Sequence, residues 1–177
     1  MSAQREVTEV FLRPGEYFVG DAGNRVRTVL GSCVSITIWH PLLRTGAMSH
    51  FLLPTRGHVT TTSPDGRYAD EVLWLMLQEL TIRDVPRTQC EAKIFGGGNM
   101  FPLHATRGRM NVGKNNGRAA RELLIACGIP IVSESLFGEG HREIIFDIST
   151  GGVRSRQTSP AEIVHSNAMQ RTTKGYT

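Results

Sequence analysis

Strand-like segments dominate the first third of the chain and constrain its fold more than any other feature. They are rich in β-branched and aromatic residues and are bounded by Gly, Pro, Asn or Asp, a pattern typical of short strands. Turn signals such as Pro14-Gly15 separate neighbouring segments, so a meander-like sheet is predicted here. The expected strands are residues 7–12, 16–20, 25–30, 34–39 and 46–53.

Two later segments carry apolar residues at helical spacing, and they predict helices over residues 68–80 and 115–127. Asp65 is the expected N-cap of the first helix, and Asn115 or Asn116 that of the second. Three further strands are expected, near residues 91–95, 130–135 and 143–148.

This order of elements predicts an α+β fold, a layered α/β sandwich of mostly antiparallel sheet covered by two main helices. At 177 residues, the chain has the length of one domain. We place that domain at residues 1–156, followed by a polar C-terminal tail over residues 157–177 with at most a short helix near residues 161–169.

Composition excludes several classes of protein. The net charge is only +4 and the basic residues are spread along the chain, which argues against a nucleic-acid partner. No stretch approaches 18 consecutive apolar residues, and the N-terminus has no apolar core of a signal peptide, so membrane insertion is not expected. A cytoplasmic location is therefore predicted.

The cysteines and histidines give no metal signature. Cys33, Cys90 and Cys127 are widely spaced without a C-x-x-C pair, and the six histidines include no H-x-x-x-H pair. Neither a disulfide framework nor a metal site is predicted.

Cys33 is the leading candidate nucleophile. It follows Gly31-Ser32 and directly precedes an expected strand, where a loop turns into a rigid element and free peptide N–H groups can face a bound carbonyl. Taken alone, the cysteine would be better interpreted as a small buried core residue. Gly31 and Ser32 are the expected neighbours of an oxyanion.

The presence of His50 favours a catalytic role for this cysteine. If residues 34–39 and 46–51 form an antiparallel hairpin, Cys33 and His50 share a face only when paired positions have an odd sum. A sum of 83 places them directly opposite, and a sum of 85 makes them diagonal neighbours. An adjacent imidazole lowers the pKa of a thiol and shuttles its proton, which suits acyl transfer on an amide or ester. His40 has the opposite parity to Cys33 along the strand, so it is expected to face the other side of the sheet.

A third group is expected to orient the imidazole. Thr28, five residues before Cys33, is the candidate, although threonine is also an ordinary strand residue. The glycines at 96–98, followed by Asn99, lack the motif of a phosphate loop. Gly97 and Asn99 are instead expected near the substrate or the Cys33 loop, with a tight turn as the alternative.

These motifs together resemble the CheD family of chemoreceptor glutamine deamidases. The resemblance runs from about Gly15 to Gln157. It is carried by the segments GSCVSITIWHPLLRTGAMSHFLLP, GRYADEVLWLMLQEL, EAKIFGGGNMF, MNVGKNN and ACGIPIVSE.

The resemblance implies a layered sandwich with a Cys-His-Thr site and no cofactor. Cys33 matches the family's nucleophile and His50 its base. In some relatives the catalytic threonine lies six residues before the cysteine, a position that Arg27 occupies here, so Thr28 fits with a shift of one residue. Such a shift reverses the face of a strand.

The implied activity is hydrolysis of glutamine side chains on methyl-accepting chemotaxis receptors to glutamate and ammonia, with receptor methylesterase activity as an addition. Two alternatives stay open. One is a binding module that docks on receptors or on a CheC-type phosphatase, and the other is a small-molecule amidase or cysteine protease.

Overall fold

The computed structural model describes residues 6–57, 63–100 and 111–159, and the proposed helix near residues 161–169 lies outside them. The strands are β1 (Thr8–Phe11), β2 (Tyr17–Gly20), β3 (Asn24–Leu30), β4 (Val34–His40), β5 (Thr45–Ser49), β6 (Glu91–Gly96), β7 (Ile131–Leu136), β8 (His141–Asp147) and β9 (Gly152–Thr158). The helices are α1 (Ala69–Ile82), α2 (Val112–Ala126) and the short 3₁₀ helix η1 (Arg87–Gln89).

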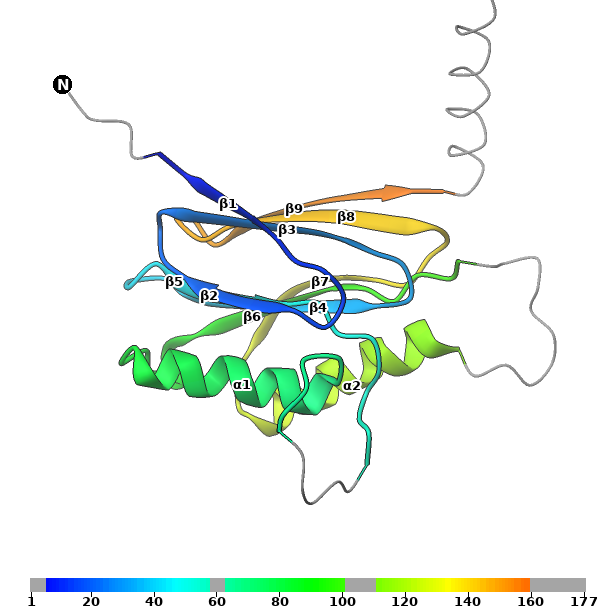
Figure 1. The fold of residues 1–177 in the computed structure, drawn as a ribbon, viewed down its shortest axis with the longest axis horizontal. Helices are drawn as coiled ribbons and strands as arrows, with labels where there is room; N and C mark the ends of the chain where they lie inside the picture. Colours follow the sequence, from blue (N-terminus) through cyan, green and yellow to red (C-terminus); the bar gives the residue numbers. More distant parts are fainter. Residues whose placement is uncertain (1–5, 58–62, 101–110, 160–177) are drawn as a thin grey trace, which may run out of the picture.

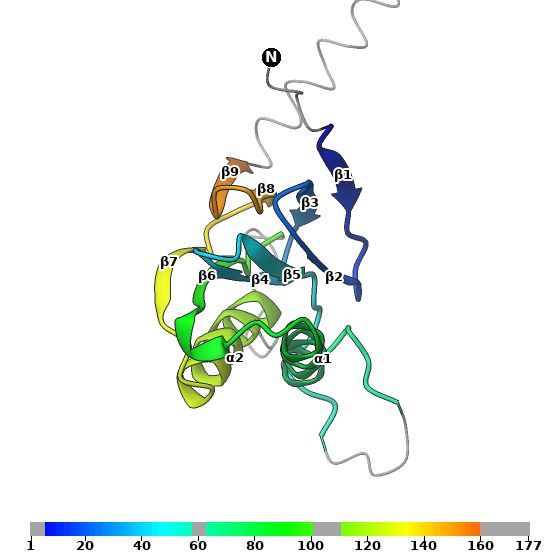
Figure 2. The ribbon, with the colours of Figure 1, turned by 90° about the vertical axis from the view of Figure 1, so that its left-hand side faces the viewer.

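The described chain forms three layers, two sheets and one layer of helices (Figure 1; Figure 2). The outer sheet has the strand order β1-β3-β8-β9, and the central sheet has the order β2-β5-β4-β6-β7. Helices α1 and α2 cover the face of the central sheet that points away from the outer sheet (Figure 2). This is the predicted α+β layered sandwich with two main helices.

The expected meander in the first third is wrong, because the first four strands alternate between the two sheets and only β4 and β5 form a hairpin. Strands β1 and β3 belong to the outer sheet, while β2, β4 and β5 belong to the central one. Strand β1 pairs parallel with β3, and β6 pairs parallel with β7, whereas the remaining pairs are antiparallel. Turn residues show where the chain reverses, but not which sheet the next strand joins.

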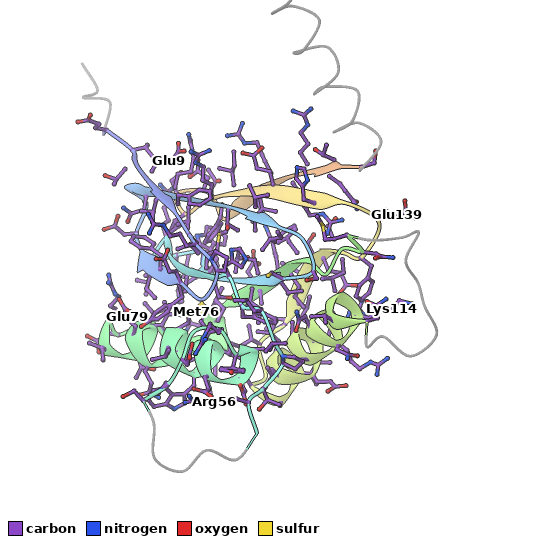
Figure 3. The ribbon with its side chains drawn as sticks, turned by 45° about the vertical axis from the view of Figure 1, so that its right-hand side comes forward. Glu9, Arg56, Met76, Glu79, Lys114 and Glu139 are labelled. Carbon is purple, nitrogen blue, oxygen red and sulfur yellow. The ribbon has the colours of Figure 1, made fainter. Side chains whose placement is uncertain are left out.

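Two apolar clusters hold the layers together. One lies between the central sheet and the helices, where Val34, Phe51 and Met76 are fully buried; Figure 3 shows Met76 on α1 beneath the sheet. The other lies between the two sheets and includes Val26, Leu30 and Phe146. Strand β4 is buried along nearly its whole length, which explains its almost continuous run of β-branched and apolar residues.

Both predicted helix caps are wrong. Helix α1 begins after Tyr68 without a side-chain cap, and the carboxylate of Asp65 accepts hydrogen bonds from Arg67 instead. Helix α2 begins three residues earlier than predicted, because the side chain of Asn111 accepts a hydrogen bond from the Lys114 N–H and caps it. Asn116 therefore lies inside the helix.

Strand β9 was not among the expected strands. Its residues are mostly polar and exposed, since β9 is an edge strand of the outer sheet. Its pairing with β8 continues to Thr158, so the ladder includes Gln157.

Candidate active site

His50 directly follows β5, and the hairpin register decides what lies beside it. Strands β4 and β5 pair with a constant sum of 85, and the bridge between Val34 and Phe51 keeps this register at the open end. Cys33 and His50 are thus diagonal neighbours, one of the two predicted arrangements, and such neighbours lie roughly 7–8 Å apart. Val34 and Phe51 belong to the cluster under the helices, so Cys33 and His50 face the outer sheet.

The backbone of His50 is fixed by the turn between β1 and β2. Its N–H donates to the Glu16 carbonyl at 2.9 Å, and its carbonyl accepts from the Gly15 N–H at 2.7 Å. Gly15 has a φ of +87°, a conformation that glycine adopts without strain. The imidazole therefore projects from a backbone that is held on both sides.

Thr28 reaches the same imidazole from the other sheet. Its Oγ1 lies 2.8 Å from Nδ1 of His50, and both side chains are buried, with exposed fractions of 0% for Thr28 and 3% for His50. On β3 the inward side chains are Val26, Thr28 and Leu30, whereas Arg27 points outward to Glu9. The structure thus brings Thr28, and not Arg27, to His50.

Hydrogen bonding around Thr28 fixes the tautomer of His50. The Thr28 hydroxyl also lies 2.7 Å from the Leu12 carbonyl oxygen, which can only accept. The single hydroxyl proton satisfies Leu12, so Thr28 Oγ1 accepts a hydrogen bond from Nδ1–H. This assignment leaves Nε2 of the neutral ring with a free lone pair.

Burial lowers the pKa of His50 below its ordinary value of 6.5, against smaller raising effects from the Leu12 carbonyl and Glu16. Near neutral pH the ring is therefore uncharged. An uncharged imidazole with a free Nε2 is able to accept a proton.

Burial also raises the pKa of the Cys33 thiol, against a smaller lowering effect of its own backbone N–H. The expected lowering of this pKa by the imidazole is therefore wrong for the resting protein. Desolvation acts on both groups and disfavours the charged form of each, so the thiol and imidazole form a neutral pair.

Three successive peptide groups around Cys33 have their carbonyls held by hydrogen bonds. The carbonyl of Gly31 accepts from Gly98 N–H at 2.8 Å, and that of Cys33 accepts from Gly97 N–H at 2.9 Å. The carbonyl between them, of Ser32, accepts from Nδ2 of Asn116 at 3.0 Å.

The N–H of each of these peptides points away from the donor that holds its own carbonyl, because the C=O and N–H of a trans peptide are antiparallel. The Val34 N–H donates to the Phe51 carbonyl. Within the described ranges, the Ser32 and Cys33 N–H groups donate to no other residue. Two neighbouring donors beside a thiol are the arrangement that stabilises an oxyanion.

The glycines at 96–98 pack against this loop and donate two of its backbone hydrogen bonds. Gly97 has a φ of +67°, and a Cβ on Gly97 would lie 2.7 Å from the carbonyl oxygen of Gly113 in the first turn of α2. A side chain on Gly31 would meet Met100. At Gly97 the positive φ and the backbone contact require glycine, whereas a Cβ at Gly31 would displace the Met100 side chain.

Asn99 is exposed and directly follows Gly98, whose N–H bonds the Cys33 loop. Its backbone N–H donates to the Gly138 carbonyl, and its carbonyl accepts from the Gly140 N–H. This part of the β7–β8 connection includes Glu139, which Figure 3 shows at the same end of the molecule as Lys114 of α2.

Two buried polar residues at the site were not among the candidate site residues from the sequence, where Asn116 was considered as a helix cap. Asn116 has an exposed fraction of 0%, and Arg142 one of 5%. Nη1 and Nη2 of Arg142 donate to the carbonyls of Gly96 and Phe137 and to the side chain of Gln157. Each stands at an inward position of its element among apolar residues, and this break in the apolar pattern is the signal that could have found them.

His40 lies at the opposite end of β4 and takes no part in the site. Its Nδ1 accepts from the Leu43 N–H at 3.1 Å, and its Nε2 lies 3.2 Å from Oε1 of Gln89. The parity prediction for His40 agrees with this position.

The geometry defines a class of protein first: an α+β sandwich in which Thr28 contacts His50 between the two sheets, with Cys33 as a diagonal neighbour of His50. The family model for CheD, described as CheD chemotactic sensory transduction, matches residues 52–157. The chain therefore belongs to the CheD family.

Named relatives agree with this assignment. A protein of Albidiferax ferrireducens named "Probable chemoreceptor glutamine deamidase CheD 2" is 58% identical, with 90% of this chain and 93% of the relative covered. A Dechloromonas aromatica protein named "Probable chemoreceptor glutamine deamidase CheD 3" is 40% identical, with 86% of this chain and 89% of the relative covered.

Among solved structures, the hypothetical protein YfiH of Bacillus licheniformis superposes on 64% of this chain and 47% of its own, with 12% identity and a TM-score of 0.41. Within the described residues, no helix is both long enough and apolar enough to cross a membrane.

Proposed function

We propose that this chain is a chemoreceptor glutamine deamidase, which converts glutamine side chains of methyl-accepting chemotaxis receptors to glutamate and ammonia. The observation that carries the proposal is the contact between Thr28 and His50 beside the Cys33 loop. The names of the relatives supply the substrate, and membership in the CheD family supplies the setting of chemotaxis.

In the proposed mechanism, the thiol of Cys33 attacks the carboxamide carbon of the glutamine. Its proton passes to Nε2 of His50 as the S–C bond forms, because the resting pair is neutral. The carbonyl oxygen becomes an oxyanion, which the Ser32 and Cys33 N–H groups stabilise.

His50 then returns the proton to the departing nitrogen, so that ammonia leaves and a glutamyl thioester remains on Cys33. Water, activated by His50, attacks the thioester carbon, and the S–C bond breaks to release glutamate and restore the thiol. The sum is glutamine plus water to glutamate plus ammonia, and the scheme uses no cofactor.

The remaining candidate residues have supporting roles in this proposal. Thr28 holds the tautomer of His50, and Gly31 and Gly97 shape the loop that presents Cys33. Because the Gly97 N–H is already bonded to the Cys33 carbonyl, we assign it to positioning rather than to the oxyanion. Asn99, exposed near this loop, is the proposed contact for the receptor.

Mass spectrometry of receptor cytoplasmic fragments incubated with the protein tests the function. Deamidation adds about one dalton at a defined glutamine, because an amide is replaced by an acid. Fragments incubated with Cys33→Ala are the control and are expected to stay unchanged. Unmodified glutamines with the active protein, under conditions where it binds the fragments, would refute the assignment. Methyl-ester fragments in parallel show whether esters are also hydrolysed.

The second candidate function is a binding module that docks on receptors or on a CheC-type phosphatase. Cys33→Ala separates the two readings, since it removes the nucleophile from a half-buried loop and leaves the surface nearly unchanged. Full chemotactic function with this variant would favour the module. Loss of function with binding intact favours the enzyme. A cytoplasmic location is part of the proposal, because the mechanism needs a reduced thiol.

A further inference from the structure

Asn116 occupies an unusual position for an amide side chain. It lies in the second turn of α2 with an exposed fraction of 0%, on the helix face that packs against the central sheet. Its Oδ1 is buried and receives no hydrogen bond from any residue of the described chain. A buried acceptor without a donor is unfavourable, so the amide needs a reason to be there.

The reason lies in its Nδ2 group, which joins the two chain segments of the site. It donates to the Ser32 carbonyl at 3.0 Å and to the Leu52 carbonyl at 2.7 Å. Ser32 directly precedes Cys33, and Leu52 follows His50 by two residues. One NH₂ group thus connects the nucleophile loop to the segment that carries the base.

Helix α2 approaches the loop closely enough for this because its first turns carry glycines. The α carbon of Gly113 has no room for a Cβ against the Gly97 carbonyl, and a Cβ on Gly117 would lie 2.7 Å from the ring of Phe137. Asn116 stands between these glycines. The helix therefore brings a rigid donor to the Ser32 carbonyl.

The bond to Ser32 determines where the next N–H points. Ser32 and Cys33 share a peptide group, and no peptide bond among the described residues is cis, so holding the carbonyl toward α2 turns the Cys33 N–H away from it. Without Asn116, this peptide is the one of the three whose carbonyl has no backbone donor to hold it.

We propose that Asn116 is a positioning residue that locks the Ser32–Cys33 peptide with its N–H toward the reacting carbonyl. It acts through that peptide and touches no substrate. The inference rests on the proposed function for its biological meaning, but its chemistry is measurable on the enzyme alone. Loss of the amide weakens oxyanion stabilisation while leaving the thiol and His50 in place.

Two reactions of Cys33 separate these effects. Acylation by p-nitrophenyl acetate passes through a tetrahedral oxyanion, whereas alkylation by iodoacetamide is a displacement at carbon that forms none. Both rates are measured for the unmodified protein, for Asn116→Ala and for Asn116→Ser, which retains one donor. The half-buried neighbour Asn115, changed to Ala, is the matched control on the same helix.

We expect Asn116→Ala to lower the acylation rate about tenfold or more, since removal of a whole oxyanion donor costs about 10²–10³ in other enzymes. Its alkylation rate is expected to stay within about twofold. Asn116→Ser should recover part of the acylation rate, and Asn115→Ala should change neither rate. If Asn116→Ala is unfolded by circular dichroism, Asn116→Ser alone carries the comparison.

An equal fall in both rates would overturn the proposal, because it would show general disruption of the site. So would an unchanged acylation rate in the folded variants, or a Cys33 that p-nitrophenyl acetate does not acylate in the unmodified protein. Failure of the proposed function has a different signature. In that case the ratio of the two rates responds to Asn116 as expected, while receptor glutamines stay unmodified.

Discussion

Thr28 and His50 come from different sheets, and their side chains meet at 2.8 Å in the space between them. The contact joins β3 of the outer sheet to the end of β5 in the central sheet. Because the Thr28 hydroxyl donates to Leu12, the contact also sets the proton on Nδ1 of His50. The stacking of the sheets thereby prepares the base for its reaction.

Replacing Thr28 with Val keeps the shape of the side chain but removes the hydroxyl. We expect turnover to fall, by less than the roughly 10²–10⁴-fold that a general acid–base group contributes, because His50 itself remains. Thr28→Ser should restore much of the rate. Ammonia release measures turnover, and ¹⁵N NMR of the imidazole reports the tautomer. A Val variant with full activity and an unchanged tautomer would contradict the role.

His50→Ala should lower turnover by about 10²–10⁴-fold, because it removes the proton acceptor. His40→Ala is the matched histidine control, since His40 is equally buried but bonds only to Gln89 and Leu43 at the far end of β4. Its turnover per folded molecule should stay within a few-fold. Circular dichroism checks that both variants fold. A larger loss with His40→Ala would mean that the assigned base is wrong.

Cys33 should be labelled by iodoacetamide faster than the other thiols near neutral pH. Cys90 is buried, and burial raises its pKa to about 11. Since burial also raises the pKa of Cys33, its labelling depends on proton acceptance by His50, and His50→Ala should slow it several-fold. Cys127 is the internal standard, because it lies at the end of α2 away from His50. Peptide mapping by mass spectrometry gives each rate; equal labelling of all three thiols would argue against a tuned nucleophile.

Activity should fall in acid with a midpoint below pH 6.5. Burial lowers the pKa of His50, so the ring stays neutral to a lower pH than a free imidazole, and kcat/KM is lost only as pH falls through the lowered value. Stability shifts in the same direction. The unfolded chain binds the proton more readily, so the free energy of unfolding falls as pH drops below about 6.5. Proton NMR of the ring provides the pKa, and a midpoint above 6.5 would refute the neutral pair.

Arg142→Met should destabilise the fold. The guanidinium donates to the carbonyls of Gly96 and Phe137 and to Gln157, and its loss removes these hydrogen bonds, which for a charged donor contribute about 1.5–3 kcal/mol each. At about 2–4 °C per kcal/mol for a chain of this size, Tm should fall by several degrees. Arg156→Met, an exposed change on β9, should leave Tm nearly unchanged. Equal melting of the two variants would show that Arg142 adds no net stability.

Local patterns in the sequence predicted most of the strands, both main helices and part of the proposed site. Period-two burial and turn residues located most strands, and the parity of the hairpin placed Cys33 and His50 on one face while excluding His40. The edge strand β9 escaped because its side chains are polar and exposed, so no apolar alternation marks it. Asp65 and Asn115 were suitable cap residues, but backbone geometry at Tyr68 and Asn111 decided where the helices begin.

Only the tertiary structure decided how the two sheets stack on each other and where helix α2 contacts the central sheet. The partnership of Thr28 with His50, the anchoring of Ser32 by Asn116 and the contacts of Arg142 all join segments that are distant in sequence or belong to different layers. Sequence spacing carries no information on the stacking of two sheets or the approach of a helix. Those are set by the packing of whole apolar faces, and burial in that packing also raises the pKa of the Cys33 thiol, which the imidazole was expected to lower.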